Sequence, residues 1–204
     1  MYRIVDFSAL IRYVAIATTM ISVLVYEFLR RFLIDDLPIL RVFTIGPWIA
    51  LVIVLMITIG PISRFIWRTL SFFVPSLYPD LNGIWEGEIT LENQVKLPAR
   101  AAIRQSLLQV QIDLHTESAK SLTLETTPAI ESGQFKLYYT YLSRPKNPNW
   151  PPYTGSTIFD VRLPNKDPAR PLELSGYYFT DRKTHGRVRL QQVDKKISAD
   201  MSYY

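Results

Sequence analysis

The longest uninterrupted apolar stretch of the chain runs from Val42 to Ser63 and is bounded by Arg41 and Arg64. It contains about 22 residues without a charge, which is long enough for a helix to cross a hydrocarbon core of ~30 Å. Soluble proteins rarely bury an uncharged helix of this length. The pattern therefore predicts a membrane-spanning helix over this stretch.

A second apolar stretch precedes it, from Phe7 to Tyr26, and its only charge is Arg12 near one end. A long arginine side chain at that position can reach the lipid headgroups, so the charge does not argue against insertion. The stretch runs into Glu27 and Phe28 with no small-residue cleavage site of a signal peptide. We therefore expect a retained first transmembrane helix and a hairpin connection to the second.

Small residues at helical spacing mark one face of each predicted helix. The pairs are Ala15 with Thr19, Thr18 with Ser22, and Gly46 with Ala50. Small side chains let helix backbones approach closely in a membrane. They predict either packing of the hairpin against itself or packing between protomers, and both remain open at this stage.

Arginines near the predicted helices favour an orientation with both termini in the cytoplasm. They are Arg30, Arg31 and Arg41 on the connection, and Arg3, Arg12, Arg64 and Arg68 on the side of the termini. By the positive-inside rule, the side with more arginines faces the cytoplasm, and a hairpin keeps both termini on that side. After the second helix, residues 64–77 keep their aromatics and predict a helical extension at the membrane interface.

From about Asp80 the pattern changes to an alternation with a period of two residues, with turn signals about every eight to twelve positions. Such a pattern is typical of an antiparallel barrel or sandwich. We place eight strands at 83–92, 98–105, 107–116, 120–127, 134–143, 154–163, 171–181 and 186–193. Short turns between most of them predict an up-and-down barrel just wide enough for one small ligand. The chain thus divides into a membrane hairpin, residues 1–79, and a soluble β-barrel, residues 80–204.

The composition limits the chemistry that this architecture can carry. The chain of 204 residues has no cysteine, which excludes disulfides, thiolate chemistry and palmitoylation. Its net charge of +5 is modest, and much of the basic excess lies near the membrane segments. Anionic lipid headgroups explain that excess as well as a nucleic-acid partner would.

The inventory of reactive side chains offers little support for catalysis. The only histidines, His115 and His185, have no second strong ligand at metal-binding spacing. Glu86 and Glu88 share a strand face that the predicted parity places outside the barrel, so acid–base work is disfavoured. No glycine-rich phosphate loop or nucleophile elbow is present. We therefore expect a binding protein with no catalytic residue, metal or cofactor.

Short motifs mark the two ends of the predicted barrel. Its start carries LNGIWEG at residues 81–87, and its last strands carry GYYFTD at 176–181 and GRVRL at 186–190. The first motif resembles the opening strand of lipocalin-like barrels, where the glycine permits a tight entry and the tryptophan plugs the closed end. Gly83, Trp85 and Gly87 would then face the interior.

Two short transmembrane helices followed by these motifs in a compact β domain resemble the membrane-anchored β-barrel effectors of CBASS anti-phage defence. The resemblance implies a barrel that binds a cyclic dinucleotide made by a partner nucleotidyltransferase, a CD-NTase. It also implies that ligand binding promotes self-association, after which the helices disrupt the bacterial inner membrane and kill the infected cell. The barrel and both termini would lie in the cytoplasm, and we expect no DNA or RNA partner.

Strand parity predicts where a ligand would bind. In an up-and-down barrel the start of the first strand and the end of the eighth lie at one end, which Trp85 closes. The opposite end collects aromatic side chains that can stack on bases, guanidinium groups that can bind phosphates, and hydroxyls. The candidate ligand-binding residues there are Tyr141, Arg144, Trp150, Tyr153, Thr157, Tyr178, Thr180 and Arg182.

Arg144 and Arg182 are the favoured phosphate-binding candidates because both lie at strand ends. Truncating either is expected to cost on the order of 1.5–3 kcal/mol of binding free energy. The alternative function is a membrane-anchored, lipocalin-like carrier of an apolar small molecule. An apolar cavity would favour the carrier, whereas an aromatic, hydroxyl-rich and basic one would favour the nucleotide receptor.

Overall fold

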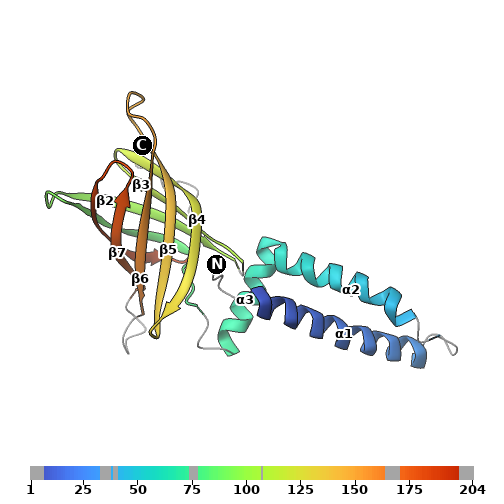
Figure 1. Ribbon diagram of the computed structural model, residues 1–204. Helices are drawn as coiled ribbons and strands as arrows, with labels where there is room; N and C mark the ends of the chain where they lie inside the picture. The colour runs from blue at the N-terminus through green and yellow to red at the C-terminus, as the bar shows by residue number, and fades with distance from the viewer. Residues whose placement is uncertain are drawn as a thin grey trace. The chain divides into compact units, whose positions relative to one another are not determined.

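The computed structural model describes residues 7–32, 38, 41–73, 78–106, 108–163 and 171–197. The chain divides into two compact units, one of helices within Val5–Pro75 and one of strands within Ser76–Tyr204 (Figure 1). Four predicted features fall outside the described residues. They are Arg3, most of the connection between the predicted helices, the end of the interfacial extension at 74–77, and the first residue of the predicted third strand, Leu107.

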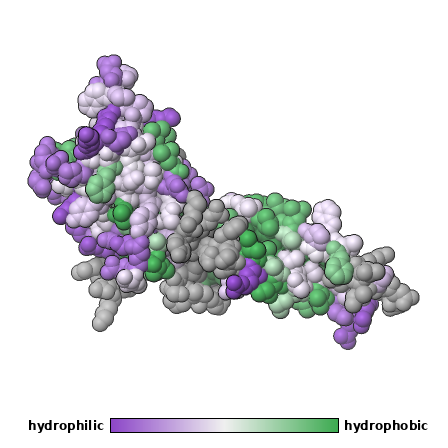
Figure 2. Space-filling model, in the orientation of Figure 1, coloured by the Kyte–Doolittle hydropathy of each residue, from purple (hydrophilic) through white to green (hydrophobic). Residues whose placement is uncertain are grey.

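The helical unit contains α1 (Phe7–Phe32), α2 (Arg41–Thr58) and α3 (Gly60–Phe73), with α1 and α2 side by side (Figure 1). Many of their large apolar side chains are exposed, and Figure 2 shows hydrophobic residues gathered over these helices. In the described part of the chain, Ile11–Phe32 is by itself long and apolar enough to cross a membrane. An apolar surface of this extent suits contact with lipid rather than water.

The predicted second transmembrane helix is not continuous, which corrects the expectation of a single helix over residues 42–63. α2 ends at Thr58, α3 begins at Gly60, and the two are bent by 86° at the break. Pro61 explains the bend, because it has no backbone N–H to donate and disfavours a helical conformation of the residue before it. The two pieces pass the length and hydropathy test only as a pair. A second span therefore requires that the bent pair crosses as one unit.

Small residues form the contact between α1 and α2. A Cβ added at Gly46 of α2 would lie 3.8 Å from the Oγ of Ser22, which is buried on α1. The Ser22 hydroxyl donates to the Thr18 carbonyl at 2.7 Å, so its polarity is satisfied within its own helix. Thr19, by contrast, is exposed. Ser22 and Gly46 thus pack against each other within the hairpin. Thr19, on α1, is not covered by that contact.

The strand unit is a closed antiparallel barrel in which each strand pairs with its sequence neighbours and β8 pairs with β1. This confirms the predicted eight-stranded up-and-down barrel, whose closure leaves no unpaired sheet edge. The strands are β1 (Gly83–Leu91), β2 (Lys96–Gln105), β3 (Val110–Thr116), β4 (Ala119–Glu131), β5 (Gln134–Pro145), β6 (Tyr153–Arg162), β7 (Glu173–Thr180) and β8 (His185–Asp194).

Alternation places one set of side chains inside the barrel and the other outside. On the outside, Glu86 pairs with Arg100 at 2.8 Å and Glu88 pairs with Lys96 at 2.7 Å. Both pairs are solvent-exposed, as the predicted parity requires, and such pairs contribute at most ~1 kcal/mol to stability. The interior is correspondingly apolar along most of its length.

Trp85 closes one end of the barrel, as the lipocalin-like motif predicted. Its side chain is 0% exposed, and its Nε1 donates to the Leu81 carbonyl at 2.9 Å. Gly83 is also buried and has a φ of +133°, and a side chain there would collide with the backbone of Asp194. Gly87 lies between the outward-facing Glu86 and Glu88 but is exposed, and a side chain there would collide with the backbone of β8.

Side-chain hydrogen bonds satisfy the backbone where the chain enters the barrel. Gln105 Oε1 accepts from the Leu81 N–H at 2.9 Å, and Asn82 Oδ1 accepts from the Gln105 N–H at 2.8 Å. Gln192 Nε2 donates to the Asn82 carbonyl at 2.8 Å. These bonds replace ladder bonds that this irregular segment cannot make, and they join β1, β2 and β8 around the Trp85 end.

Candidate ligand-binding site

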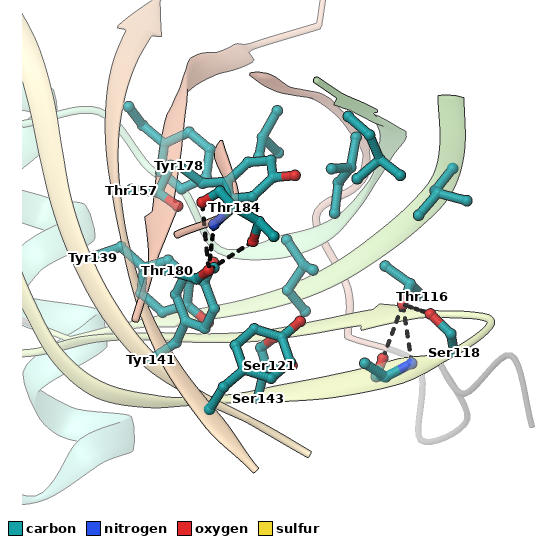
Figure 3. A pocket seen from close by; sticks show the side chains of 18 residues that line it. Thr116, Ser118, Ser121, Tyr139, Tyr141, Ser143, Thr157, Tyr178, Thr180 and Thr184 are labelled. Carbon is teal, nitrogen blue, oxygen red and sulfur yellow. Dashed lines mark hydrogen bonds between the residues drawn. The ribbon is translucent and has the colours of Figure 1, made fainter. Parts of the chain in front are cut away.

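A cavity of about 160 Å³ lies at the barrel end opposite Trp85, and Figure 3 shows its lining. That end is formed where β1, β3, β5 and β7 finish and where β2, β4, β6 and β8 begin. The apolar lining residues are Ile89, Leu91, Leu97, Leu114, Ala119, Phe159 and Val188. The hydroxyl-bearing lining residues are Thr116, Ser118, Ser121, Tyr139, Tyr141, Ser143, Tyr153, Thr157, Tyr178, Thr180 and Thr184.

Tyr139 and Tyr141 of β5 form an aromatic wall in the cavity (Figure 3). Their ring centroids are 5.0 Å apart with the planes 27° from parallel, and Phe159 of β6 stacks on Tyr139 at 6.3 Å. Residues two apart on a strand face the same side, which is why these positions of β5 meet. Aromatic faces of this kind can stack on a nucleobase.

Glycines in neighbouring strands make room for two of the tyrosines. Gly155 of β6 pairs with Tyr141, and a Cβ there would lie 2.5 Å from the tyrosine ring. Gly186 of β8 pairs with Tyr178 of β7, and a Cβ there would lie 2.6 Å from that ring. Glycine inside a strand often marks such a close approach. Any larger residue at either position must displace a ring that lines the cavity.

Several hydroxyls of the lining are held by partners within the chain. Thr116 Oγ1 accepts from the Ala119 N–H at 3.1 Å and lies 3.5 Å from Ser118 Oγ. The hydroxyl oxygens of Thr180 and Thr184 are 2.6 Å apart (Figure 3). The turns that follow β3 and β7 position these groups, so their hydroxyls have defined positions in the cavity lining.

Ser121 of β4 and Ser143 of β5 face each other as a cross-strand pair, and both are buried. Ser143 Oγ has no hydrogen-bond partner among the residues that the structure describes. Buried hydroxyls are nearly always hydrogen-bonded in folded proteins. The hydroxyl of Ser143 is therefore an exception that no contact within the described chain explains.

The described lining of the cavity presents more apolar than polar surface, and it carries many hydroxyls but no charged side chain. Burial raises the pKa of Tyr139 and of Tyr141 above the ordinary value of a phenol, and it raises the pKa of Tyr178 as well. The phenols therefore stay neutral near pH 7 and can donate hydrogen bonds. This corrects the expectation of a basic cavity, since the cations lie outside its walls.

Arg182 lies beside the cavity, next to a lining residue. Its guanidinium carbon is 4.3 Å from the centroid of the Tyr153 ring, and the guanidinium donates to the Pro151 carbonyl. The neighbouring Asp181 accepts from the backbone N–H and the hydroxyl of Thr154, both at 2.8 Å. These bonds lower the pKa of the Asp181 carboxyl, so it stays ionised and ties the end of β7 to the start of β6. Contacts with Tyr153 and Pro151 thus hold the exposed Arg182 next to an uncharged cavity.

The structure brings together most of the predicted site residues. Those that line the cavity are Tyr141, Tyr153, Thr157, Tyr178 and Thr180. Arg144 and Trp150 are not among the lining residues. Arg144 follows the inward Ser143, so it is exposed on the outer face, where it is in register with Lys120. Trp150 lies between β5 and β6 and is 55% exposed.

The sequence prediction omitted part of the lining, namely Thr116, Ser118, Ser121, Tyr139, Ser143 and Thr184. Tyr139 and Ser143 alternate with Tyr141 along β5, so the parity that selected Tyr141 could have found them. Ser121 could be found only from the pairing of β4 with β5. The threonines and Ser118 lie at strand ends or in turns, where a period of two gives no guidance.

Comparison with known proteins identifies the barrel. Residues 76–192 match the family model described as Cap15, cyclic dinucleotide receptor domain. The chain is 29% identical over 145 residues to CD-NTase-associated protein 15 of Staphylococcus schleiferi, an alignment that covers 67% of this chain and 73% of that relative. Together these matches confirm the resemblance to CBASS effectors that the two motifs and the helices indicated. The chain belongs to the Cap15 family, and its β-barrel is the cyclic dinucleotide receptor domain.

Proposed function

We propose that the barrel binds its cyclic dinucleotide in the cavity opposite Trp85 and that it acts as a receptor rather than an enzyme. The observation that supports this site is the lining, which combines stacked tyrosines with many hydroxyls. Aromatic faces can stack on bases, and hydroxyls can donate to and accept from base edges and sugars. A carrier of apolar molecules would offer no hydrogen-bonding atom to the buried Ser143 hydroxyl, which has no partner among the described residues.

In this proposal the protein is the membrane-anchored effector of a CBASS system, and a partner nucleotidyltransferase supplies the ligand. α1 supplies one span of the inner membrane and the bent pair of α2 and α3 supplies a second, so that barrel and termini lie in the cytoplasm. The ligand drives self-association only if it binds the assembled state more tightly than the dispersed one. Assembly of the helices then disrupts the membrane and kills the infected cell.

Titration of the purified full chain in detergent tests the site. Cyclic di-adenylate, cyclic di-guanylate and the mixed cyclic dinucleotide are added in turn, and a fatty acid is the comparison probe. We expect saturable binding of at least one cyclic dinucleotide and none of the fatty acid. Uptake of the fatty acid without any nucleotide binding would support the carrier instead.

Arg182→Ala should weaken binding of the preferred cyclic dinucleotide about tenfold at low salt. A guanidinium bonded to phosphate contributes roughly 1.5–3 kcal/mol, and the exposure of Arg182 places it at the lower end. The effect should shrink as ionic strength rises, because exposed charges are screened. Arg144→Ala is the matched control, since that arginine lies on the outer face and should leave affinity unchanged. Equal losses in both variants would place the phosphates on the outer face.

Gly46→Leu should reduce ligand-dependent dye release from lipid vesicles severalfold while leaving ligand affinity unchanged. A Cβ at this position already lies at contact distance from Ser22 of α1, 3.8 Å, so we expect the further atoms of a leucine to loosen the packing within the hairpin. Val52→Leu, at an exposed position of α2, is the control and should keep full release. Thr19→Leu tests the open face of α1, and loss of release there would assign that face to contact between protomers. Full release with Gly46→Leu would show that the hairpin contact is not needed.

A further inference from the structure

Ser143 is the buried polar group of the cavity whose hydrogen bonding the fold leaves incomplete. It is 1% exposed, it lines the cavity, and its Oγ has no partner among the described residues. The hydroxyls of Thr116 and Thr180, in the same lining, do have partners within the chain. A buried hydroxyl without a partner destabilises a fold, so its retention next to a ligand cavity points to a bond made by the ligand.

The charges around the cavity indicate which part of a cyclic dinucleotide enters it. The described lining carries no charged side chain, and its aromatic wall is formed by Tyr139 and Tyr141. Each phosphodiester bears a negative charge, and burying it without a cation nearby would be strongly unfavourable. A nucleobase is neutral and flat, so the wall can receive it. The phosphates then remain at the mouth, where the exposed Arg182 stacks beside the lining residue Tyr153.

The size of the cavity agrees with partial entry. Its volume is about 160 Å³, whereas pockets that enclose a whole drug-sized ligand measure roughly 300–1,000 Å³. A complete cyclic dinucleotide is at least of that larger class. The enclosed space therefore suits one base rather than the macrocycle.

We propose that one nucleobase of the ligand enters the cavity with the phosphates held outside, and that Ser143 hydrogen-bonds the edge of this base. This role for Ser143 rests on the proposed function, and it makes Ser143 the residue that distinguishes one base from another. The Ser143 hydroxyl can donate and accept, and its cross-strand neighbour Ser121 supplies a second hydroxyl beside it. A buried site that hydrogen-bonds the edge of one base discriminates strongly against other bases, because a wrong base leaves the polar groups of the site unpaired.

Ser143→Ala in the full chain separates a ligand contact from a structural role. In the ligand-free protein, the variant should unfold at the same or a higher temperature, because it removes an unpaired buried hydroxyl. Binding of the preferred cyclic dinucleotide should nevertheless weaken roughly five- to tenfold. Ser156→Ala is the matched control. Its hydroxyl lies on the outer face of β6, 3.3 Å from that of Thr140, and its removal should leave affinity unchanged.

The identity of the base distinguishes a contact to the base from a contact to phosphate, because the phosphates are the same in every cyclic dinucleotide of one linkage. The size of the Ser143→Ala loss should therefore differ between cyclic di-adenylate and cyclic di-guanylate, since their base edges carry different donors and acceptors.

Three outcomes would overturn the proposal. If the parent protein binds a cyclic dinucleotide and Ser143→Ala binds it equally well, Ser143 makes no ligand contact. If Ser143→Ala loses the same affinity for cyclic di-adenylate and cyclic di-guanylate, the hydroxyl contacts a part that the two share, such as phosphate, and the orientation is reversed. If the parent binds no cyclic dinucleotide at all, the proposed function itself fails, and with it this assignment.

Discussion

Replacing Trp85 with alanine should lower the free energy of unfolding of the barrel by about 3–5 kcal/mol. The side chain is 0% exposed, it lies in the apolar core, and its Nε1–H is hydrogen-bonded to the Leu81 carbonyl. Truncation would leave a large cavity at the closed end and an acceptor without its donor. Both effects add, since the surrounding strands form a closed ladder that cannot collapse freely.

Denaturant unfolding followed by tryptophan fluorescence and far-ultraviolet circular dichroism measures this effect. Trp150→Ala is the matched control, because that tryptophan is 55% exposed and should change stability by less than about 0.5 kcal/mol. If Trp85→Ala and Trp150→Ala unfold alike, Trp85 does not support the core in the way its burial indicates.

Replacing Tyr141 with alanine should weaken cyclic dinucleotide binding by about 1–3 kcal/mol, which is roughly five- to 150-fold. Tyr141 lines the cavity and stacks on Tyr139, so its loss removes one face of the aromatic wall. Tyr177→Ala is the control on the outer face of β7, where the side chain is 54% exposed and its loss should leave affinity unchanged. Calorimetric titration of the full chain compares the variants.

Two further variants distinguish the contribution of the Tyr141 ring to affinity from that of its hydroxyl and from that of its position in the cavity. Tyr141→Phe keeps the ring and should retain most of the affinity. Gly155→Val leaves Tyr141 in the sequence but places its Cβ 2.5 Å from the ring, so the ring must move and binding should fall. Unchanged affinity in both Tyr141→Ala and Gly155→Val would show that the ligand does not use this wall.

The strand pattern and the closed end of the barrel could be predicted from the sequence. Alternation of apolar and polar residues is a local property, because each strand turns successive side chains to opposite faces whatever its neighbours are. This rule located every strand, put Glu86 and Glu88 outside, and placed Trp85 at one end and Tyr141 at the other. The same rule would also have found Tyr139 and Ser143.

The position of Arg144 and the shape of the second apolar segment depended on contacts between strands and on the geometry of the chain. Arg144 lies near the end of a strand at the cavity end of the barrel, but the alternation along β5 places its side chain on the outer face. The pairing of β5 with β4 puts Arg144 opposite Lys120. The apolar segment is bent by 86° next to Pro61, where hydropathy alone predicted one continuous helix.

The cavity itself was decided only by the tertiary structure. Gly155 admits the Tyr141 ring across the β5–β6 pair, and Ser121 meets Ser143 across the β4–β5 pair. The positions that meet in each case lie many residues apart in the chain. Their meeting depends on strand register and barrel closure, which no local period encodes. The sequence by itself therefore determined the β-barrel and placed Trp85 and Tyr141 at its opposite ends, and the tertiary structure decided that the described cavity lining is uncharged and that Ser143 Oγ has no partner there.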